Sequence, residues 1–436
     1  MIINFLKKEI KNTSSLQIFF IYVVCLIFFL IFCNVYLSLY LNKSPFYIDT
    51  NNNLILKSLP FDYGDLLHNL YYNGEYVQKI RHFNIDFHLA RLPFYPIFIL
   101  FLAKINLNFY FIFFAKNIIS FSVIFFFCFI FLKDLNKSIF HFLILLFLFW
   151  YNPYNTHVLL SLDFSDTLIA ALFPIIYLLV LSKNSYLNFF FSLFAFSLYL
   201  MKASLWLFCI LFPLIILYIN FIRFNYSFKK IFILPVLFVC LAISLWGFFG
   251  LKKANYFPIG SSANSTNTYF LTSLLNDKFN DHYPDLTVDL LLDLKKDEIP
   301  KFKNEKNFYI FYKNKNLDFL KENYIYYLKG VLKKVNFIFF SIHTDAKTKK
   351  EDNQIRFSNV PNKLFLLTAI ITSIFYLTKN FFNNRKILYP ELIFLVMLAL
   401  YIAPHIVAWA TTKHLVAIFL LSKLYLFLKL FNCLEK

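Results

Sequence analysis

Two pairs of aspartates could do acid–base chemistry, because each pair lies beside a long apolar run. Asp62 and Asp65 follow the first apolar run, and Asp163 and Asp166 come just before a later one. A spacing of three residues places the carboxylates of a pair on one face of a helix, where one of them can take the proton of an attacking hydroxyl group. Helix capping is the alternative, and it is the commoner role of an aspartate such as Asp62. In the second pair Ser165 or Asp166 could cap a helix, although one cap does not need two aspartates.

Cationic residues could bind a phosphate group near these carboxylates. Arg91 precedes Pro93 and carries a guanidinium group, which suits bidentate contact with phosphate. Lys202 stands alone between two apolar runs, and Lys413 and His414 begin the last run. Each of these residues could instead anchor an apolar segment by reaching to lipid headgroups. A joint arrangement with the aspartates on one face of a membrane is what favours a functional site.

The elements that position these residues are apolar helices. Hydrophobic residues make up 59% of the 436 residues, which is more than a soluble core of this length can bury. Runs of roughly 20 apolar residues can cross a bilayer. We find such runs near 16–41, 109–132, 138–152, 167–182, 186–201, 203–222, 230–250, 362–378, 387–403 and 414–432. The sequence therefore predicts an all-α polytopic membrane protein with roughly ten transmembrane helices.

The orientation follows from the short loops, because those rich in lysine and arginine all fall on one side. The positive-inside rule then places both termini on the cytoplasmic side of the membrane, which we expect to be a bacterial inner membrane. The outer segments are 42–108, 151–166 and 251–361. The last of these is rich in lysine, but the rule is weak for loops longer than about 60 residues. It contains two helical patches, 286–296 and 316–335.

We expect three parts along the chain. Residues 1–250 form an N-terminal transmembrane domain whose first outer loop, 42–108, is catalytic; 251–361 form a small extracytoplasmic domain; and 362–436 form the C-terminal transmembrane helices. Within the first loop, Leu92–Lys104 is apolar but too short to span comfortably, and it opens with proline, which a helix start tolerates. We expect it to lie as a helix at the membrane interface.

The sequence offers little for a cofactor or a nucleic acid. The histidines have no metal-ligand spacing, the six cysteines show no paired spacing in any loop, and a chain with 6 glycines has no phosphate-cradling glycine loop. We expect no cofactor and no metal site, although a divalent metal held by carboxylates stays open. The net charge of +19 suits anionic lipid headgroups and a phosphorylated ligand. No basic stretch is organised around base-stacking aromatic residues, so nucleic acid is not an expected partner.

Several short elements together resemble a known family. Asp62-Tyr63, the Asn69-Leu70 and Gly74-Glu75-Tyr76 elements, and Arg91-Leu92-Pro93-Phe94-Tyr95-Pro96 resemble the first outer loop of GT-C fold glycosyltransferases, in the protein mannosyltransferase and aminoarabinose transferase-like group. Leu162 to Leu168 is similar to the family's "Ser-Glu-x-Leu", with Asp166 in the glutamate place. Lys413-His414 stands where the family often has Arg-Tyr. Leu92 and Phe94 replace the family's usual proline and glycine.

The resemblance implies transfer of a sugar from a polyprenyl-phosphate carrier to a lipid, glycan or protein acceptor on the extracytoplasmic face, with inversion. Asp62 or Asp65 would be the general base, and cations would stabilise the leaving phosphate. The substrate-binding residues that it implies are Tyr63, Arg91, Tyr95, Asp163, Asp166, Lys202, Lys413 and His414.

Three alternatives remain at this point. An O-antigen polymerase or ligase also handles lipid-linked saccharides, but its usual mark is a large outer loop rich in arginine. The loop 251–361 is instead rich in lysine and has a single arginine, Arg356, so we rank this alternative lower. A transporter or flippase for lipid-linked saccharides would place carboxylates at the membrane midplane rather than at the surface. A structural membrane subunit would be indicated by aspartates that lie far apart.

Overall fold

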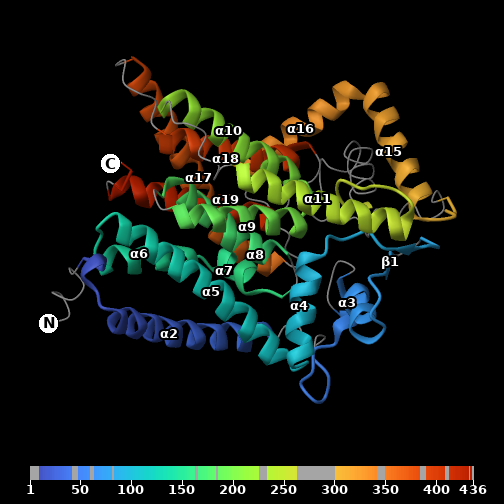
Figure 1. The fold of residues 1–436 in the computed structure, drawn as a ribbon, viewed down its shortest axis with the longest axis horizontal. Coiled ribbons are helices and arrows are strands. Elements are labelled where there is room, and N and C mark those ends of the chain that lie inside the picture. The colour runs from blue at the N-terminus through green and yellow to red at the C-terminus, as the bar shows by residue number, and fades with distance from the viewer. Residues whose placement is uncertain are drawn as a thin grey trace.

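The protein is almost entirely helical in the residues that the structure describes (Figure 1). A computed structural model describes residues 9–41, 48–58, 63–80, 83–162, 165–182, 185–224, 233–262, 300–340, 349–382, 389–407, 412–431 and 433–434. These ranges contain fifteen α-helices, three short 3₁₀ helices and one small hairpin. The expected all-α fold is therefore confirmed at the level of secondary structure.

Each of the ten apolar runs coincides with a helix. They are α2 (Ser15–Leu41), α5 (Phe109–Asp134), α6 (Ile139–Trp150), α8 (Asp166–Leu181), α9 (Ser185–Met201), α10 (Trp206–Phe224), α11 (Ile233–Ala254), α17 (Lys349–Phe382), α18 (Tyr389–Val407) and α19 (Thr412–Leu430). Four segments within the described ranges are long and apolar enough to cross a membrane: Ser15–Leu39, Phe109–Asp134, Ile233–Ala254 and Asn359–Lys379. The protein thus has transmembrane-helix character, and most of the other apolar helices are shorter.

The bundle is built around α8. This helix packs against α5, α9 and α19, and nearly all of its side chains are buried. By contrast, α2 lies along the edge of the molecule and leaves Phe19, Phe28 and Leu39 exposed. A helix that is apolar on all sides is buried in a protein or in a membrane, and α2 has few protein neighbours. Lipid therefore suits the exposed side of α2.

The remaining elements connect the helices of the bundle or lie at the end where Figure 1 shows α3, β1 and α15. They are η3 (Leu56–Ser58), α3 (Tyr63–Tyr72), β1 (Gln78–Lys79), β2 (Asp86–Phe87), α4 (Phe94–Ile105), α7 (Pro153–Leu160), η4 (Ala203–Leu205), α15 (Glu305–Glu322) and α16 (Tyr324–Phe339), while η1 (Ile10–Asn12) lies near the N-terminus. The strands pair antiparallel, with Gln78 opposite Phe87. A helix was expected over Leu92–Lys104, and α4 begins directly after Pro93, its N-cap residue.

The segment 151–166 contains the short helix α7, whose N-terminus is capped by the side chain of Asn152. One expectation for the segment 251–361 needs correction. The patch expected over 316–335 is divided between α15 and α16, since Asn323 has the non-helical φ of −128° and ψ of 33°. The patch expected over 286–296 lies outside the described residues.

Candidate functional site

An ion pair stands at the start of the central helix. Asp166 is the first residue of α8, and its Oδ1 lies 2.7 Å from Nζ of Lys202, which directly follows α9. Asp166 is only 6% exposed. Ser165 occupies the N-cap position of α8 without a side-chain capping hydrogen bond. The Asp166 carboxylate therefore joins α8 to the end of α9, and a buried charge of this kind requires such a partner.

A second group of side chains comes from the first outer loop. The ring of Tyr63, the first residue of α3, meets the ring of Tyr95 in α4 edge-on, with centroids 5.5 Å apart. The Arg91 guanidinium carbon lies 5.4 Å from the centre of the Tyr63 ring, within cation–π range. The sequence named all three as candidate site residues, and the structure brings them together.

The two groups are in contact with each other. The Tyr63 hydroxyl lies 3.5 Å from Oγ of Ser165, the neighbour of Asp166. The Tyr95 hydroxyl donates a hydrogen bond to the carbonyl oxygen of Leu162, in the same connection between α7 and α8. The first loop and the start of α8 thus form one continuous polar layer, although about 100 residues separate them in sequence.

A buried lysine holds the connection from the other side. Lys116 lies inside α5, and its Nζ donates to the carbonyl oxygens of Leu159 at 2.6 Å and Ser161 at 3.0 Å, and to Oδ1 of Asn117 at 3.1 Å. Positive charge is favourable at a helix C-terminus, where carbonyl groups lack intrahelical partners. Lys116 therefore fixes the end of α7 and the backbone that leads to Asp166. Its signal in the sequence was a single lysine within an apolar run.

A buried carboxylate from the segment 251–361 holds the backbone of the segment 42–108 in place. Glu305, at the start of α15, is 3% exposed. Its Oε2 accepts from the backbone N–H of His88 at 2.8 Å, and its Oε1 accepts from the N–H of Leu89 at 3.0 Å and from the hydroxyl of Ser262 at 2.6 Å. Burial raises the pKa of Glu305, and these hydrogen bonds act in the opposite direction. Sequence reasoning missed Glu305.

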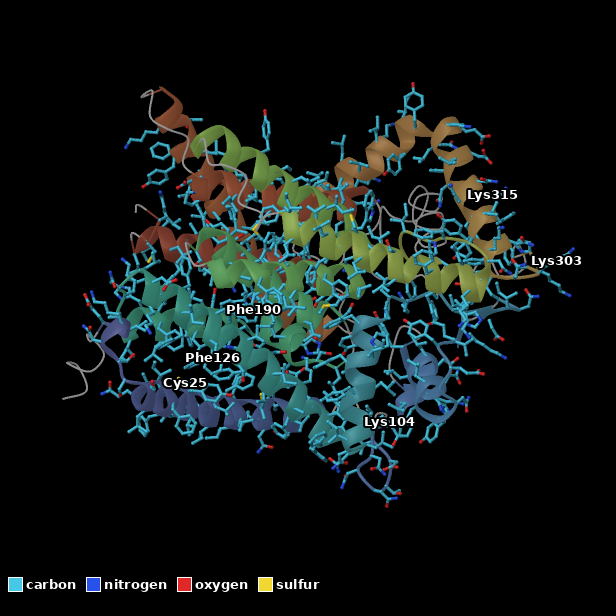
Figure 2. The ribbon with its side chains drawn as sticks, in the orientation of Figure 1. Cys25, Lys104, Phe126, Phe190, Lys303 and Lys315 are labelled. Carbon is cyan, nitrogen blue, oxygen red and sulfur yellow. The ribbon has the colours of Figure 1, made fainter. Side chains whose placement is uncertain are left out.

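The backbone that Glu305 holds leads directly to Arg91. Tyr76 donates its hydroxyl to the carbonyl oxygen of Arg91 at 2.8 Å. His88 Nδ1 lies 3.0 Å from the carbonyl oxygen of Tyr76, a contact that requires a proton on this nitrogen. At the far end of the loop, Lys104 donates to the carbonyl oxygen of Tyr71 and ties α4 to α3, and Figure 2 shows it at the edge of the molecule beside α4. The backbone on both sides of Arg91 is therefore held in place.

The other candidate residues are placed only in part. Asp65 lies in the first turn of α3, and among the described residues no hydrogen bond or ion pair involves its carboxylate. Lys413 and His414 lie in the first turn of α19, but their side chains are outside the described set. Asp62 and Asp163 lie outside the described residues altogether.

The C-terminal half of α18 also lies near the ion pair. Tyr401 is close to Asp166, and its ring centroid lies 5.3 Å from that of His405. In the ranges that the structure describes, no three His, Cys, Asp or Glu side chains are grouped to hold a metal ion. The site thus combines an arginine, a lysine, a carboxylate and tyrosine hydroxyls, which suit a ligand with anionic and hydroxyl groups. Comparisons with protein-family models, curated proteins and solved structures find no match to this chain.

Proposed function

We propose that this protein is a membrane glycosyltransferase with a GT-C-like architecture. It moves a sugar from a polyprenyl-phosphate donor to a lipid, glycan or protein acceptor on the extracytoplasmic face. The observation that carries the proposal is the contact of Tyr63 and Tyr95 with the segment that leads into α8 and its Asp166–Lys202 pair, with Arg91 packed over the Tyr63 ring. These side chains come from distant parts of the chain, and their chemistry matches a phosphorylated sugar.

The reaction is a direct displacement at the anomeric carbon of the sugar. The acceptor oxygen forms a bond to this carbon while the bond from the carbon to the phosphate oxygen breaks, and its electron pair leaves with the phosphate. Asp62 or Asp65 takes the acceptor proton. Arg91 stabilises the charge that develops on the phosphate, because its planar guanidinium contacts two phosphate oxygens at once. One displacement inverts the anomeric configuration.

The ion pair has a separate task in this proposal. Lys202 keeps Asp166 ionised, because an adjacent positive charge favours the charged form of a carboxylate. The ionised carboxylate is a hydrogen-bond acceptor and, in this proposal, accepts hydrogen bonds from sugar hydroxyls. Asp163, Lys413 and His414 are assigned to substrate binding from their places in the sequence.

The proposed topology has roughly ten transmembrane helices and both termini in the cytoplasm of a bacterial inner membrane. Its support is the coincidence of ten helices with the ten apolar runs. In this orientation α3, α4 and α15 lie outside, where a lipid-linked donor presents its sugar. The donor, the acceptor and the surrounding lipids are the expected partners.

The test compares surface glycans and glycolipids in a deletion strain by mass spectrometry. We expect the deletion to remove a glycosylated product and expression of the wild-type protein in the deletion strain to restore it. The intensity of this product in the mass spectrum is called the transfer signal. Asp65→Asn and Asp62→Asn are then expressed separately from the same promoter. Loss of the transfer signal by at least about 100-fold is expected for the variant that lacks the base. An unchanged glycan profile in the deletion strain contradicts the proposal, and full signal from both variants contradicts the assignment of the base.

A transporter or flippase for lipid-linked saccharides is the second candidate, and one residue favours it. Lys423 lies in α19, is 2% exposed, and has no hydrogen-bond acceptor among the described residues. Its Nζ lies 4.4 Å from the ring centre of Tyr151 and 5.8 Å from that of Phe365. Ionisable residues inside a bundle often mark transport pathways. Movement of a lipid-linked saccharide across vesicles that contain the protein, abolished by Lys423→Met, would support this function over transfer.

A further inference from the structure

Helix α16 connects the outer arch of the molecule to the membrane bundle. Figure 1 shows α15 and α16 as an arch that leaves the end of α11 and returns to the bundle. The returning helix packs against α17 and α18. Lys363 of α17 donates hydrogen bonds from its Nζ to the carbonyl oxygens of Phe337 and Ile338, at the end of α16. Lys363 lies in Asn359–Lys379, which is apolar and long enough to cross a membrane. The end of α16 therefore lies at the level where that segment begins.

One side of α16 is both apolar and exposed. Leu328 is 54% exposed and Leu332 is 68% exposed, and Tyr324 and Ile325 are also exposed. At about 100° per residue, these four side chains fall within an arc of about 100°. A run of large apolar side chains on one helix face is far more than the scattered exposed residues of an ordinary soluble surface. This face needs an apolar environment.

The neighbouring arc of the same helix is cationic. Lys329 and Lys333 are exposed and follow the apolar arc directly around the helix, while Gly330, Lys334 and Phe337 are buried on the opposite side. An apolar arc beside a lysine arc is the composition of helices that lie in a membrane interface, with one face among acyl chains and the other at the headgroups. Lysine ammonium groups there attract anionic lipids.

Exposed apolar residues also lie on the helix against which α16 ends. Along α17 the residues Leu364, Ile371 and Phe375 are exposed, with Ile371 at 66%. They belong to the candidate membrane span against which α16 ends. Figure 2 shows Lys303 and Lys315 at the end of the molecule beside α15, far from Phe126 and Phe190 in the bundle. These two charged side chains thus lie apart from the apolar side chains of the bundle. The same lipid that covers α17 is therefore adjacent to α16.

We propose that α16 is a membrane-interface helix that binds the lipid leaflet on the side of α15. Tyr324, Leu328 and Leu332 enter the upper acyl region, and Lys329 and Lys333 contact the anionic headgroups. The arch is then fixed to the leaflet at α16 and to the first outer loop at Glu305. This inference does not depend on the reaction that the protein catalyses.

The test measures the depth of spin labels in the full-length protein. Single cysteines are introduced into a variant whose six native cysteines are replaced, and the protein is placed in nanodiscs that contain anionic phospholipid. Leu332→Cys is the test position. Ile371→Cys is the lipid reference, and Asn314→Cys, on an exposed position of α15, is the water reference. We expect oxygen to increase the relaxation rate of the label at position 332 at least about twofold more than a water-soluble nickel chelate does. The label at 371 should also respond more to oxygen, and the label at 314 should respond more to the nickel chelate.

Lipid charge provides the second arm of the test. We expect Lys329→Glu with Lys333→Glu, or nanodiscs of phosphatidylcholine alone, to shift the label at 332 toward water. A label at 332 that behaves like the label at 314 overturns the proposal. Dipolar coupling between labels on two copies would instead assign the face to a protein dimer, and a label at 332 that is inaccessible to both oxygen and the nickel chelate would assign it to the chain itself. Both results also overturn the proposal.

Discussion

The described part of the chain contains two buried ion pairs with the same separation but different surroundings. Asp166 and Lys202 are 2.7 Å apart, and so are Glu391 and Lys429. The second pair joins α18 to α19 toward the other end of α8, where Tyr177 donates its hydroxyl to the carbonyl oxygen next to Glu391. Tyr177 and Asp166 are eleven residues apart on α8, or about 16 Å along the helix.

The difference between the pairs lies in what else touches them. The residue before Asp166 contacts Tyr63, whose ring also meets the Tyr95 ring edge-on and lies beneath the Arg91 guanidinium group. At the second pair, Lys429 lies 3.7 Å from the ring centre of Tyr376, a side chain of the bundle itself. Pair geometry alone therefore does not identify a functional site. What distinguishes the first pair is that Tyr63, with Arg91 and Tyr95 against its ring, contacts the residue before Asp166, and we propose the functional site there for this reason.

The largest expected effect separates the two pairs directly. Asp166→Asn is expected to reduce the transfer signal by about 100-fold or more, because it removes a charged group that contacts the sugar. Glu391→Gln is expected to change the transfer signal by less than about threefold per folded molecule. Both variants lower the melting temperature of the purified protein, since removal of one partner from a buried pair costs about 3–5 kcal/mol in soluble proteins.

Double variants distinguish lost chemistry from lost folding. Asp166→Asn with Lys202→Met and Glu391→Gln with Lys429→Met each remove both charges, so both proteins should regain thermal stability. Only the second is expected to give the full transfer signal, whereas the first should stay about 100-fold below it. If the Asp166 double variant also transfers normally, the two pairs are equivalent and the site assignment is wrong.

A smaller effect is expected from the loss of Glu305, which holds the backbone before Arg91. Glu305→Ala leaves two backbone N–H groups and one hydroxyl without their acceptor, at about 1–3 kcal/mol for each buried group. We expect amide hydrogen exchange at His88 and Leu89 to accelerate at least tenfold, and the transfer signal to fall by about tenfold as Arg91 loses its fixed position. Glu322→Ala changes an exposed carboxylate of the same helix and should leave both readouts unchanged. Unaltered exchange at residues 88 and 89 would contradict this role of Glu305.

Much of the helical framework could be predicted from sequence, because a long apolar run has few other structures available to it. The ten runs all fall on helices. The break at Asn323 could not be read in the same way, since polar and apolar residues continue across it without a proline or glycine. The short helix α7 did have a signal that was not used, namely Asn152 followed by Pro153 at its first position.

The site residues also divide into those that had a local signal in the sequence and those that had none. Tyr63, Arg91 and Asp166 stood out because of their residue types beside apolar segments, and the structure places them within one layer. Glu305 had no local signal, because its backbone partners lie 217 and 216 residues away along the chain. Its role comes from the tertiary fold. Lys116 could have been singled out, since a lysine within a span needs a partner, but the carbonyl groups that it binds could not.

The smallest expected effect tests the link between the outer loop and the first ion pair. Tyr63→Phe removes the hydroxyl that lies 3.5 Å from Ser165 but keeps the ring that meets Tyr95 and Arg91. One neutral hydrogen bond contributes about 0.5–1.5 kcal/mol, so the transfer signal should fall by about two- to tenfold. Tyr376→Phe is the matched change at the second pair, where the ring beneath Lys429 is also kept, and it should leave transfer unaltered. Equal losses from both variants would mean that the hydroxyls act only through the stability of the bundle. A loss confined to Tyr63→Phe would assign the Asp166–Lys202 pair and the first loop to one site.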